Sequence, residues 1–358
     1  MTRVGDKYLR LYTFHKLIKE ILQVYDKDYL NEFPFDGESD NFKFGVDRVK
    51  KLIENNMVND FNYDAILIDE VQLFEPDWID ICYSLLDIPS KNVFEMYGDV
   101  NQDIKFKSKL GKSTWKKAKV FNHVFERIGL SINYRNSKGI VDYIDGMMID
   151  ANNYLINNGV HVDTKGIAYS NRVKNSLMKK PIIKEIPQNN ISSIVNIIKR
   201  IIDTYDCEYN DIAVIYPYYS FDQFYKPGYF IEKFLVDNNI PFNVISSTKN
   251  SESNKNGVYI STIDSTMGLD FKYIILCGLH SLDFYHNKIY SVCEKLSKGI
   301  KCKKYDAFYS YGEAANKIYT ACSRAREVIF ILDDLDNDSP LKNVIYHSDK
   351  KTYIKENI

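Results

Sequence analysis

Two adjacent carboxylates, Asp69 and Glu70, follow the apolar run AILI at residues 65–68. Carboxylate oxygens are the ligands that Mg²⁺ prefers, so Asp69 could hold this ion through its water shell. A second carboxylate beside it could orient and deprotonate a water molecule that attacks phosphorus. The pair therefore indicates magnesium-assisted hydrolysis of a phosphate, although an acidic turn that only ends a strand would have the same two residues.

The acidic pair is not isolated, because four short motifs later in the chain also contain residues that could bind or react with a phosphate. Each motif lies beside an apolar run or within a helical segment. These residues are Gly98, Asp99 and Gln102 in GDVNQ, Arg135 in LSINYR, Thr262, Gly268 and Asp270 in TIDSTMGLDF, and Tyr319, Ser323, Arg324 and Arg326 in YTACSRAR.

The elements that must position these residues alternate between strands and helices. Apolar runs bounded by polar turns predict strands near 65–69, 93–98, 212–217, 258–263, 273–278 and 328–332. Helical periodicity predicts helices at 12–25, 76–86, 137–156, 191–205 and 312–327, which places Arg324 and Arg326 on the last helix. This alternation favours an α/β fold with parallel sheets covered on both faces, whose ligands gather at the carboxyl ends of the strands.

Composition sets broad limits on the class of protein. A chain of 358 residues is long enough for two domains, and its formal net charge of −1 excludes a globally basic nucleic-acid binder, so any basic surface must be local. The six cysteines include no CxxC pair, which favours a reduced, cytoplasmic setting without a zinc site. No run of 18 apolar residues is present, and we expect no membrane partner.

Taken in order, the motifs resemble those of the superfamily 1 helicases of the UvrD/Rep/PcrA type. That family carries DExQ, GDxxQ, L-x-x-NYR, T-x-x-S-x-x-GL-D/E-F and Y-x-A-x-(S/T)-R-A-R in this order, and YTFHKLIKEIL at 12–22 looks like its TFH segment. The resemblance spans about residues 10–332. It implies two RecA-like P-loop NTPase-type domains, ATP and Mg²⁺ as cofactors, and single-stranded DNA, or RNA, as the partner.

The resemblance assigns catalytic roles residue by residue. Asp69 would hold Mg²⁺ and Glu70 would be the catalytic base. Arg135 and Arg324 would reach the γ-phosphate from the second domain, where two guanidiniums neutralise charge on the phosphoryl oxygens. Arg326 belongs to the same motif as Arg324, but it could instead be a solvated residue at the end of the helix.

Further positions would bind rather than catalyse. Gln72 and Gln102 would couple the γ-phosphate to the nucleic-acid site, and Asp270, where the family often has Glu, would lie near the ribose. Thr262 would line the path of the nucleic acid. The family usually has His and Lys where this sequence has Asp264 and Met267, and this departure concerns the coupling to DNA rather than the fold.

The phosphate-binding loop of the family has no counterpart in the expected place. A strand–GxxxxGK[ST]–helix unit precedes the TFH segment in the family, whereas the TFH-like segment here begins at Tyr12. We therefore expect an N-terminally truncated first domain, with the P-loop missing or carried by a separate polypeptide. GKST at 111–114 is no substitute, because residue 106 is Phe instead of Gly and the acidic pair precedes it.

Lysines and aromatic residues interleave just after the GDVNQ motif. Seven lysines lie between residues 105 and 119, together with Phe106 and Trp115. Lysines on phosphates and rings stacked on bases are a common way to hold a single strand, with roughly 1–3 kcal/mol for each stacked base. Lys105, Phe106, Lys107 and Trp115 are therefore the predicted nucleic-acid contacts, and a solvated basic loop is the alternative.

These observations predict a partial first RecA-like domain at residues 1–130 and a complete second one at 131–358. With a P-loop, the chain would couple ATP hydrolysis to translocation on, and unwinding of, nucleic acid. Two alternatives remain at this level. One is a catalytically inactive nucleic-acid-binding helper module, and the other is a fragment or split gene product that needs its missing piece.

Overall fold

The computed structural model describes residues 9–33, 39–89, 91–103, 117–122, 128, 132–160, 162, 172–187, 192–218, 226–245, 256–283 and 305–356. These residues belong to two compact units. Unit 1 contains the described residues up to Asp99 together with 117–122, and unit 2 contains 100–103 and the described residues from 128 onward. The sequence-based boundary at 130/131 therefore differs from the point where the chain first enters unit 2, between Asp99 and Val100.

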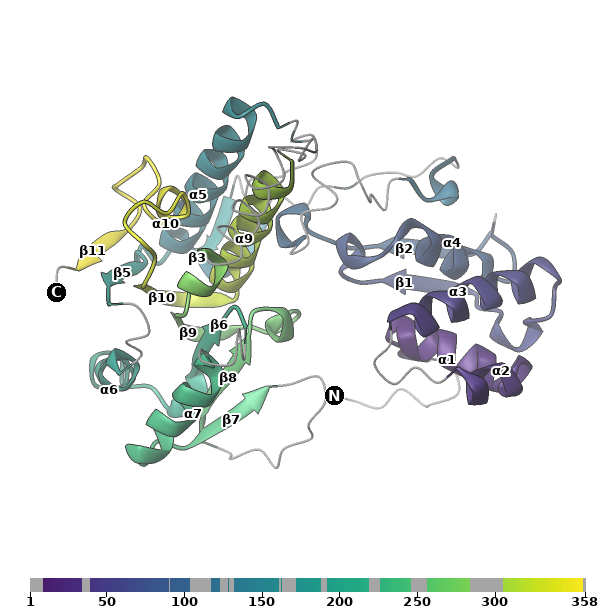
Figure 1. Ribbon diagram of the computed structural model, residues 1–358, viewed down its shortest axis with the longest axis horizontal. Helices are drawn as coiled ribbons and strands as arrows, with labels where there is room; N and C mark the ends of the chain where they lie inside the picture. The colour runs from purple at the N-terminus through teal and green to yellow at the C-terminus, as the bar shows by residue number, and fades with distance from the viewer. Residues whose placement is uncertain are drawn as a thin grey trace, which may run out of the picture. The chain divides into compact units, whose positions relative to one another are not determined.

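Unit 1 is a two-stranded parallel sheet packed on helices (Figure 1). Thr13 caps the first helix by accepting a hydrogen bond from the Lys16 backbone N–H at 3.3 Å. The elements are α1 (Phe14–Tyr25), α2 (Lys27–Glu32), α3 (Ser39–Glu54), β1 (Ala65–Ile68), α4 (Pro76–Ser84) and β2 (Val93–Met96), with 3₁₀ turns at Asn59–Phe61, Val71–Leu73 and Lys119–Asn122.

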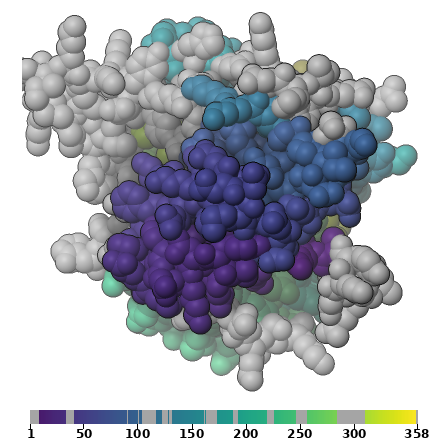
Figure 2. Space-filling view, turned by 90° about the vertical axis from the view of Figure 1, so that its right-hand side faces the viewer, coloured from purple at the N-terminus to yellow at the C-terminus, as the bar shows by residue number. Residues whose placement is uncertain are grey.

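Only one face of this small sheet is covered by described residues. Ile66, Ile68, Phe94 and Met96 pack into a core made mainly by α1, α3 and α4, whose outer surface is the purple and blue area in Figure 2. The alternate residues of the strands point the other way, and Leu67 is 61% exposed and Val93 49% exposed. Parallel sheets are normally buried on both faces, so these apolar side chains mark an open face.

Unit 2 is built on a seven-stranded, fully parallel sheet with strand order β11-β5-β10-β9-β6-β8-β7. A separate parallel pair, β3 and β4, lies beside β10. The strands are β3 (Ile132–Ser137), β4 (Arg172–Asn175), β5 (Ile182–Glu185), β6 (Ile212–Tyr216), β7 (Phe242–Ile245), β8 (Val258–Thr262), β9 (Phe271–Leu276), β10 (Ala325–Asp333) and β11 (Ile354–Glu356). The helices are α5 (Lys138–Asn157), α6 (Ser193–Tyr205), α7 (Pro227–Asp237), α9 (Tyr305–Ser323) and α10 (Lys342–Ile345).

Helices cover both faces of the large sheet, as the alternation of its buried residues requires. In β6, Ala213 and Ile215 join the core that α5 and α9 cover, while Ile212 and Val214 join the core of α6 and α7 (Figure 1). Every residue of β6 is buried, which explains why the strand reads as a continuous apolar run in the sequence. The mixed α/β class with parallel sheets is thus confirmed.

The last predicted helix ends earlier than expected, so the placement of two arginines on it was wrong. α9 ends at Ser323, where the Arg324 N–H bonds to the Ala321 carbonyl at 3.2 Å and closes a tighter turn. β10 begins at Ala325 and carries Arg326. The β-branched residues that follow, in VIFIL at 328–332, form a strand that pairs with β9 on one side and β5 on the other. This pairing outweighs the helical periodicity of the preceding residues.

No helix in the described part of the chain is both long and apolar enough to cross a membrane.

Candidate functional site

The acidic pair lies at the carboxyl end of β1 in unit 1, in an unusual backbone conformation. Asp69 is exposed and its Oδ1 accepts a hydrogen bond from the Glu70 N–H at 2.9 Å. Glu70 has φ 53° and ψ 43°, in the left-handed region that residues other than glycine rarely occupy. Strain of this kind costs on the order of 1–3 kcal/mol and is concentrated at functional sites. The strain therefore supports a role for Glu70 beyond ending a strand.

A hydrogen-bonded chain joins Glu70 to the end of the neighbouring strand. The Gln72 Nε2 donates to Glu70 Oε2 at 2.6 Å, and Gln72 Oε1 accepts from the Asp99 N–H at 3.2 Å. Gln72 is only 6% exposed, and both the nitrogen and the oxygen of its side-chain amide are hydrogen-bonded inside the unit. The DEVQ motif and the start of the GDVNQ motif are thereby brought together at the ends of the paired parallel strands β1 and β2.

Gly98 makes this arrangement possible because it leaves room for the glutamine. A Cβ atom at residue 98 would lie 2.5 Å from Gln72 Oε1 and 2.9 Å from Val71 Cγ1. We expect Gly98→Ala to displace Gln72 and to lower the free energy of unfolding by about 1–3 kcal/mol, the usual cost of overpacking. Urea denaturation measures this loss. The matched control is Gly159→Ala, whose Cβ meets nothing within 4 Å although its φ of 79° also carries strain. A smaller loss for Gly98→Ala than for Gly159→Ala would contradict the steric explanation.

In unit 2, the second half of the GDVNQ motif packs on α9. The 3₁₀ turn Val100–Gln102 precedes Asp103, whose carbonyl accepts from Asn316 Nδ2 at 2.7 Å. Gln102 Oε1 accepts a hydrogen bond from Arg324 Nη2. Arg324 is 1% exposed and is the largest fully buried side chain among the described residues. Gln102 and Arg324, predicted separately from two motifs, thus contact one another.

Asn136 fixes the segment that carries Arg135 against the segment that carries Arg324. Its buried Nδ2 donates to the carbonyl oxygens of Ser323 at 2.8 Å and Ala325 at 2.6 Å, on either side of Arg324. The Asn133 side chain in turn bonds to Asn136 Oδ1 at 2.9 Å. Asn136 was not among the residues predicted from the sequence. An asparagine directly after the NYR motif is a polar residue in a strand, which was the available signal.

Arg135 and Asp270 lie together, and Arg326 joins them. The Arg135 Nε lies 3.6 Å from Asp270 Oδ2, and the Arg326 Nε lies 3.4 Å from Asp270 Oδ1. Asp270 directly precedes β9 and Arg326 is the second residue of β10, so this cluster lies at the amino ends of two parallel strands. The acidic pair thus follows the carboxyl end of a strand, whereas this cluster does not.

Thr262 lies at the carboxyl end of its strand, whereas the cluster of Arg135, Asp270 and Arg326 lies at the amino ends of β9 and β10. It ends β8, and its Oγ1 bonds to Ser265 Oγ at 3.0 Å. Close behind it in the sequence, Asp264 pairs with Lys317 at 3.5 Å, and the Lys317 Nζ also lies 4.4 Å from the centre of the Tyr218 ring. Burial alone would lower the pKa of Lys317, but the charge of Asp264 and the contact with Tyr218 more than offset it and raise this pKa. Asp264 therefore faces a cation from α9.

The remaining predicted nucleic-acid contacts, Lys105, Phe106, Lys107 and Trp115, lie outside the described residues. Exposed aromatic surface is nevertheless present beside Arg135, because Tyr134 is 68% exposed. This tyrosine belongs to the NYR motif but received no role from the sequence, since a single Tyr among 28 carries little signal.

The donor groups fit Mg²⁺ only if phosphate and water supply most of its ligands. Within the described ranges, no three His, Cys, Asp or Glu side chains are arranged to hold a metal ion. Mg²⁺ keeps several water ligands and is commonly bound by one or two carboxylates together with substrate phosphates. The exposed carboxylate of Asp69 meets this requirement.

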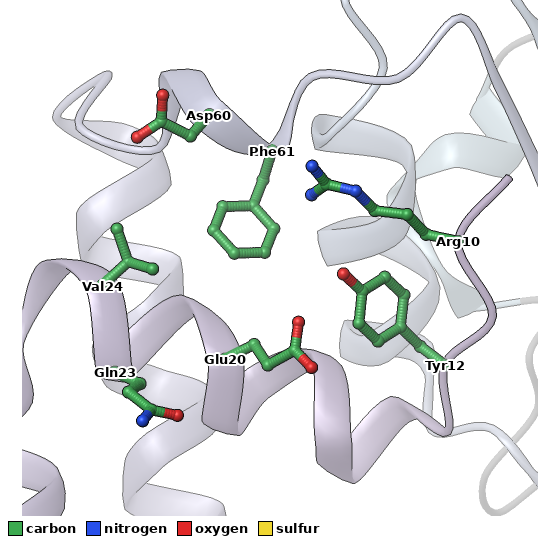
Figure 3. Close-up of a pocket in the computed structure, with 7 residues that line it drawn as sticks. All are labelled: Arg10, Tyr12, Glu20, Gln23, Val24, Asp60 and Phe61. Atoms are coloured by element: carbon green, nitrogen blue, oxygen red, sulfur yellow. The ribbon is translucent and has the colours of Figure 1, made fainter. Parts of the chain in front are cut away.

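Two cavities occur away from these residues. One in unit 1, of about 520 Å³, is lined by Arg10, Tyr12, Glu20 and Phe61 among others, and Figure 3 shows the first three directed toward the space beside the Phe61 ring. Burial and a hydrogen bond to Glu20 raise the pKa of Tyr12 to about 12. A cavity of about 600 Å³ in unit 2 is lined by Gly146, Asp150 and Thr352 among others. None of the predicted site residues lines either cavity.

A buried carboxylate beyond β9 predicts a pH dependence of stability. Burial raises the pKa of Asp283 to about 6, against a hydrogen bond from Ser339 that lowers it. A folded-state pKa above the unfolded value means that the protonated form stabilises the fold, and this contribution is lost as pH rises through about 6. We expect Asp283→Asn to stabilise the protein on the order of 2 kcal/mol at pH 8 and little at pH 4. Urea denaturation at both pH values is the measurement, and an equal gain at both would contradict it.

Unit 2 belongs to the α/β class of folds with a central parallel sheet. The sequence matches no protein-family model and no curated protein. One similar solved structure is the C-terminal domain of a possible DNA helicase from Lactobacillus plantarum WCFS1, with 15% identity and a TM-score of 0.35 over 62% of this chain and 98% of that one. Another is S. tokodaii Xpd4, with 10% identity and a TM-score of 0.32 over 86% and 93%. At these TM-scores the likeness carries no weight for function, which has to be inferred from the residues of this chain.

Proposed function

We propose that the chain is the larger part of a UvrD-like superfamily 1 motor that hydrolyses ATP and moves on single-stranded nucleic acid. In this proposal, Asp69 holds Mg²⁺ and Glu70 activates the attacking water. Arg135 and Arg324 stabilise the transferred phosphoryl group, a role that is typically worth roughly 10³-fold or more in turnover. Bound Mg²⁺ would neutralise charge on the phosphate oxygens.

The observation that carries the proposal is the convergence of separate motifs into two small clusters. Glu70 and Gln72 meet the backbone of Asp99 in unit 1. Arg135 meets Asp270 in unit 2, where Gln102 also meets Arg324. These contacts join motifs that are 27 to 222 positions apart in the sequence, and a nucleotide bound by several of these residues would explain why the polar and charged side chains of the motifs lie together. A buried guanidinium and a left-handed glutamate both cost stability, which favours a functional explanation for each.

We further propose that a phosphate-binding loop from outside these 358 residues packs on the open face of unit 1. The 358 residues contain no GxxxxGK[ST] motif. The exposed Leu67 and Val93 give an added strand–loop–helix unit an apolar face to cover, and a strand could also pair with the two-stranded sheet, to which no third described strand is bonded.

The test is Mg²⁺-dependent ATP hydrolysis with and without oligo(dT) or oligo(U). The chain alone is expected to be inactive, and its mixture with a polypeptide carrying strand–GxxxxGK[ST]–helix, first sought in the gene immediately upstream, is expected to hydrolyse ATP faster when the oligonucleotide is present. Leu67→Lys should weaken the association, whereas Val24→Lys, at another exposed apolar position of unit 1, should not. Association without any turnover would exclude the motor.

The second candidate is a nucleic-acid-binding helper module that does not hydrolyse ATP. The observation in its favour is the burial of Arg324, since a guanidinium that is 1% exposed and bonded to Gln102 has no access to a ligand in this conformation. The helper module predicts that oligonucleotide binding is the same with and without ATP in every mixture tested.

A further inference from the structure

The cluster of Arg135, Asp270 and Arg326 has more positive charge than its own carboxylate can balance. The exposed fractions of the three side chains are 39%, 38% and 43%, so all of them reach solvent. The neighbouring ionic groups in the described part of the chain do not supply the missing negative charge, because Lys272 is paired with Asp211 at 2.8 Å and Glu327 with Lys179 at 3.1 Å. Two guanidiniums therefore share a single carboxylate.

Asp270 is a loosely held occupant of this cluster. Each of its oxygens faces one arginine, but the two Nε–O distances of 3.6 and 3.4 Å exceed the 2.7–2.9 Å that is typical of charge-assisted hydrogen bonds. The Arg326 Nε, moreover, is buried and makes no hydrogen bond to any residue that the structure describes. An anion with more charge and more oxygens than a carboxylate could make the shorter, two-pronged contacts that a guanidinium favours.

Both arginines lie where the pairing of strands is irregular. Three residues of β3 around Arg135 stand opposite one residue of β4, since Asn133 pairs with Val173 and Ser137 with Asn175. Two residues of β10, the first of them Arg326, stand opposite one residue of β9. Such bulges change the direction of a side chain and are over-represented beside active sites. Both guanidiniums thus depend on a local departure from regular sheet geometry.

The backbone under the cluster is held by contacts that do not involve Asp270. The Asn136 amide joins β3 to the carbonyls of Ser323 and Ala325, and the Phe271 N–H donates to the Arg324 carbonyl at 2.9 Å. The two arginines would therefore stay near one another if their carboxylate were removed or displaced. A preorganised pair of this kind lowers the cost of binding an anion.

We propose that Arg135 and Arg326 together form a polyphosphate-binding site and that Asp270 occupies it internally until a polyphosphate displaces it. Arg326 is thereby a phosphate-binding residue in addition to Arg135. That the ligand is a nucleoside triphosphate depends on the proposed function. That the cluster binds a polyphosphate anion depends only on the geometry and charge of the cluster itself.

The experiment measures binding of inorganic tripolyphosphate to the whole chain at low salt by isothermal titration calorimetry. Asp270→Asn should tighten binding about fivefold or more, because it removes the internal competitor and one negative charge. Arg135→Gln and Arg326→Gln should each weaken binding roughly tenfold, the scale of one charge-assisted hydrogen bond. Arg326→Lys keeps the charge but not the fork of donors and should lie between wild type and Arg326→Gln.

Matched controls come from an ion pair elsewhere in unit 2. Arg200 donates to Glu356 at 2.9 Å, with exposed fractions of 48% and 28%. Arg200→Gln and Glu356→Gln change the net charge as the test variants do, and each should alter tripolyphosphate affinity less than twofold. If Asp270→Asn does no more than Glu356→Gln, or if Arg326→Gln binds as wild type does, the proposal is overturned. Circular dichroism of each variant confirms that it is folded.

This test does not depend on ATP hydrolysis or on a P-loop. Tripolyphosphate binding that responds to Asp270→Asn as expected, in a protein whose mixtures never hydrolyse ATP, would retain the anion site and exclude the motor. ATP hydrolysis that is unaffected by Arg326→Gln, together with unchanged tripolyphosphate affinity, would retain the motor and overturn the site.

Discussion

Glu70→Gln is expected to lower ATP turnover of the P-loop-complemented protein by roughly 10²–10⁴-fold, the range that general-base catalysis contributes. The amide cannot take a proton from water at neutral pH. Its oxygen can still accept the hydrogen bond that Gln72 Nε2 now donates to Glu70 Oε2 at 2.6 Å. The variant therefore removes the base while keeping the hydrogen-bonded chain from Glu70 to the Asp99 N–H, so that oligonucleotide binding should be unchanged.

The matched control for this prediction is Asp60→Asn. Asp60 lies in the 3₁₀ turn Asn59–Phe61 of the same unit, and its carboxylate also accepts a hydrogen bond from a nearby side chain, that of Tyr25, at 2.8 Å. Single-turnover hydrolysis of radiolabelled ATP separates the chemical step from product release. Comparable turnover in Glu70→Gln and Asp60→Asn would contradict the role of Glu70, and a complemented wild type without turnover would favour the helper module.

The parts of the fold that the sequence predicted are those in which local pattern and tertiary burial agree. β6, β8, β9 and β10 are central strands of the seven-stranded sheet, and their apolar runs are continuous because helices cover both faces. β5, β7 and β11 were missed. These strands are three or four residues long, and β7 and β11 carry partly exposed residues, so they give no clear period.

The candidate site was predicted as a set of residues but not as a set of contacts. Gln102 and Arg324 are 222 positions apart, and Asn136 is separated from its two carbonyl partners by 187 and 189 positions. One sequence contains no information on which polar groups pair over such distances. Arg326 is an example. Because the helical period continues through YTACSRARE, the sequence predicted that Arg326 lies on a helix, whereas it lies on β10 and pairs with Asp270.

Arg324→Met is expected to reduce ATP turnover of the complemented protein by roughly 10³-fold, the scale of losing an arginine that stabilises transferred phosphate. Its effect on folding should be small by comparison. Methionine fills much of the same volume, and removing a buried charge removes its desolvation cost as well. Gln102→Leu should instead cost about 1–3 kcal/mol of stability, because it takes an acceptor away from a guanidinium that stays buried.

The double variant Gln102→Leu with Arg324→Met separates stability from catalysis. It should recover most of the stability lost in Gln102→Leu alone, since no buried guanidinium is left without that acceptor, and it should remain as inactive as Arg324→Met. Urea denaturation of the four proteins gives the coupling free energy between the two side chains. A coupling near zero would mean that the contact between Gln102 and Arg324 does not persist in solution. Recovery of turnover together with stability would mean that Arg324 supports the fold rather than the chemistry.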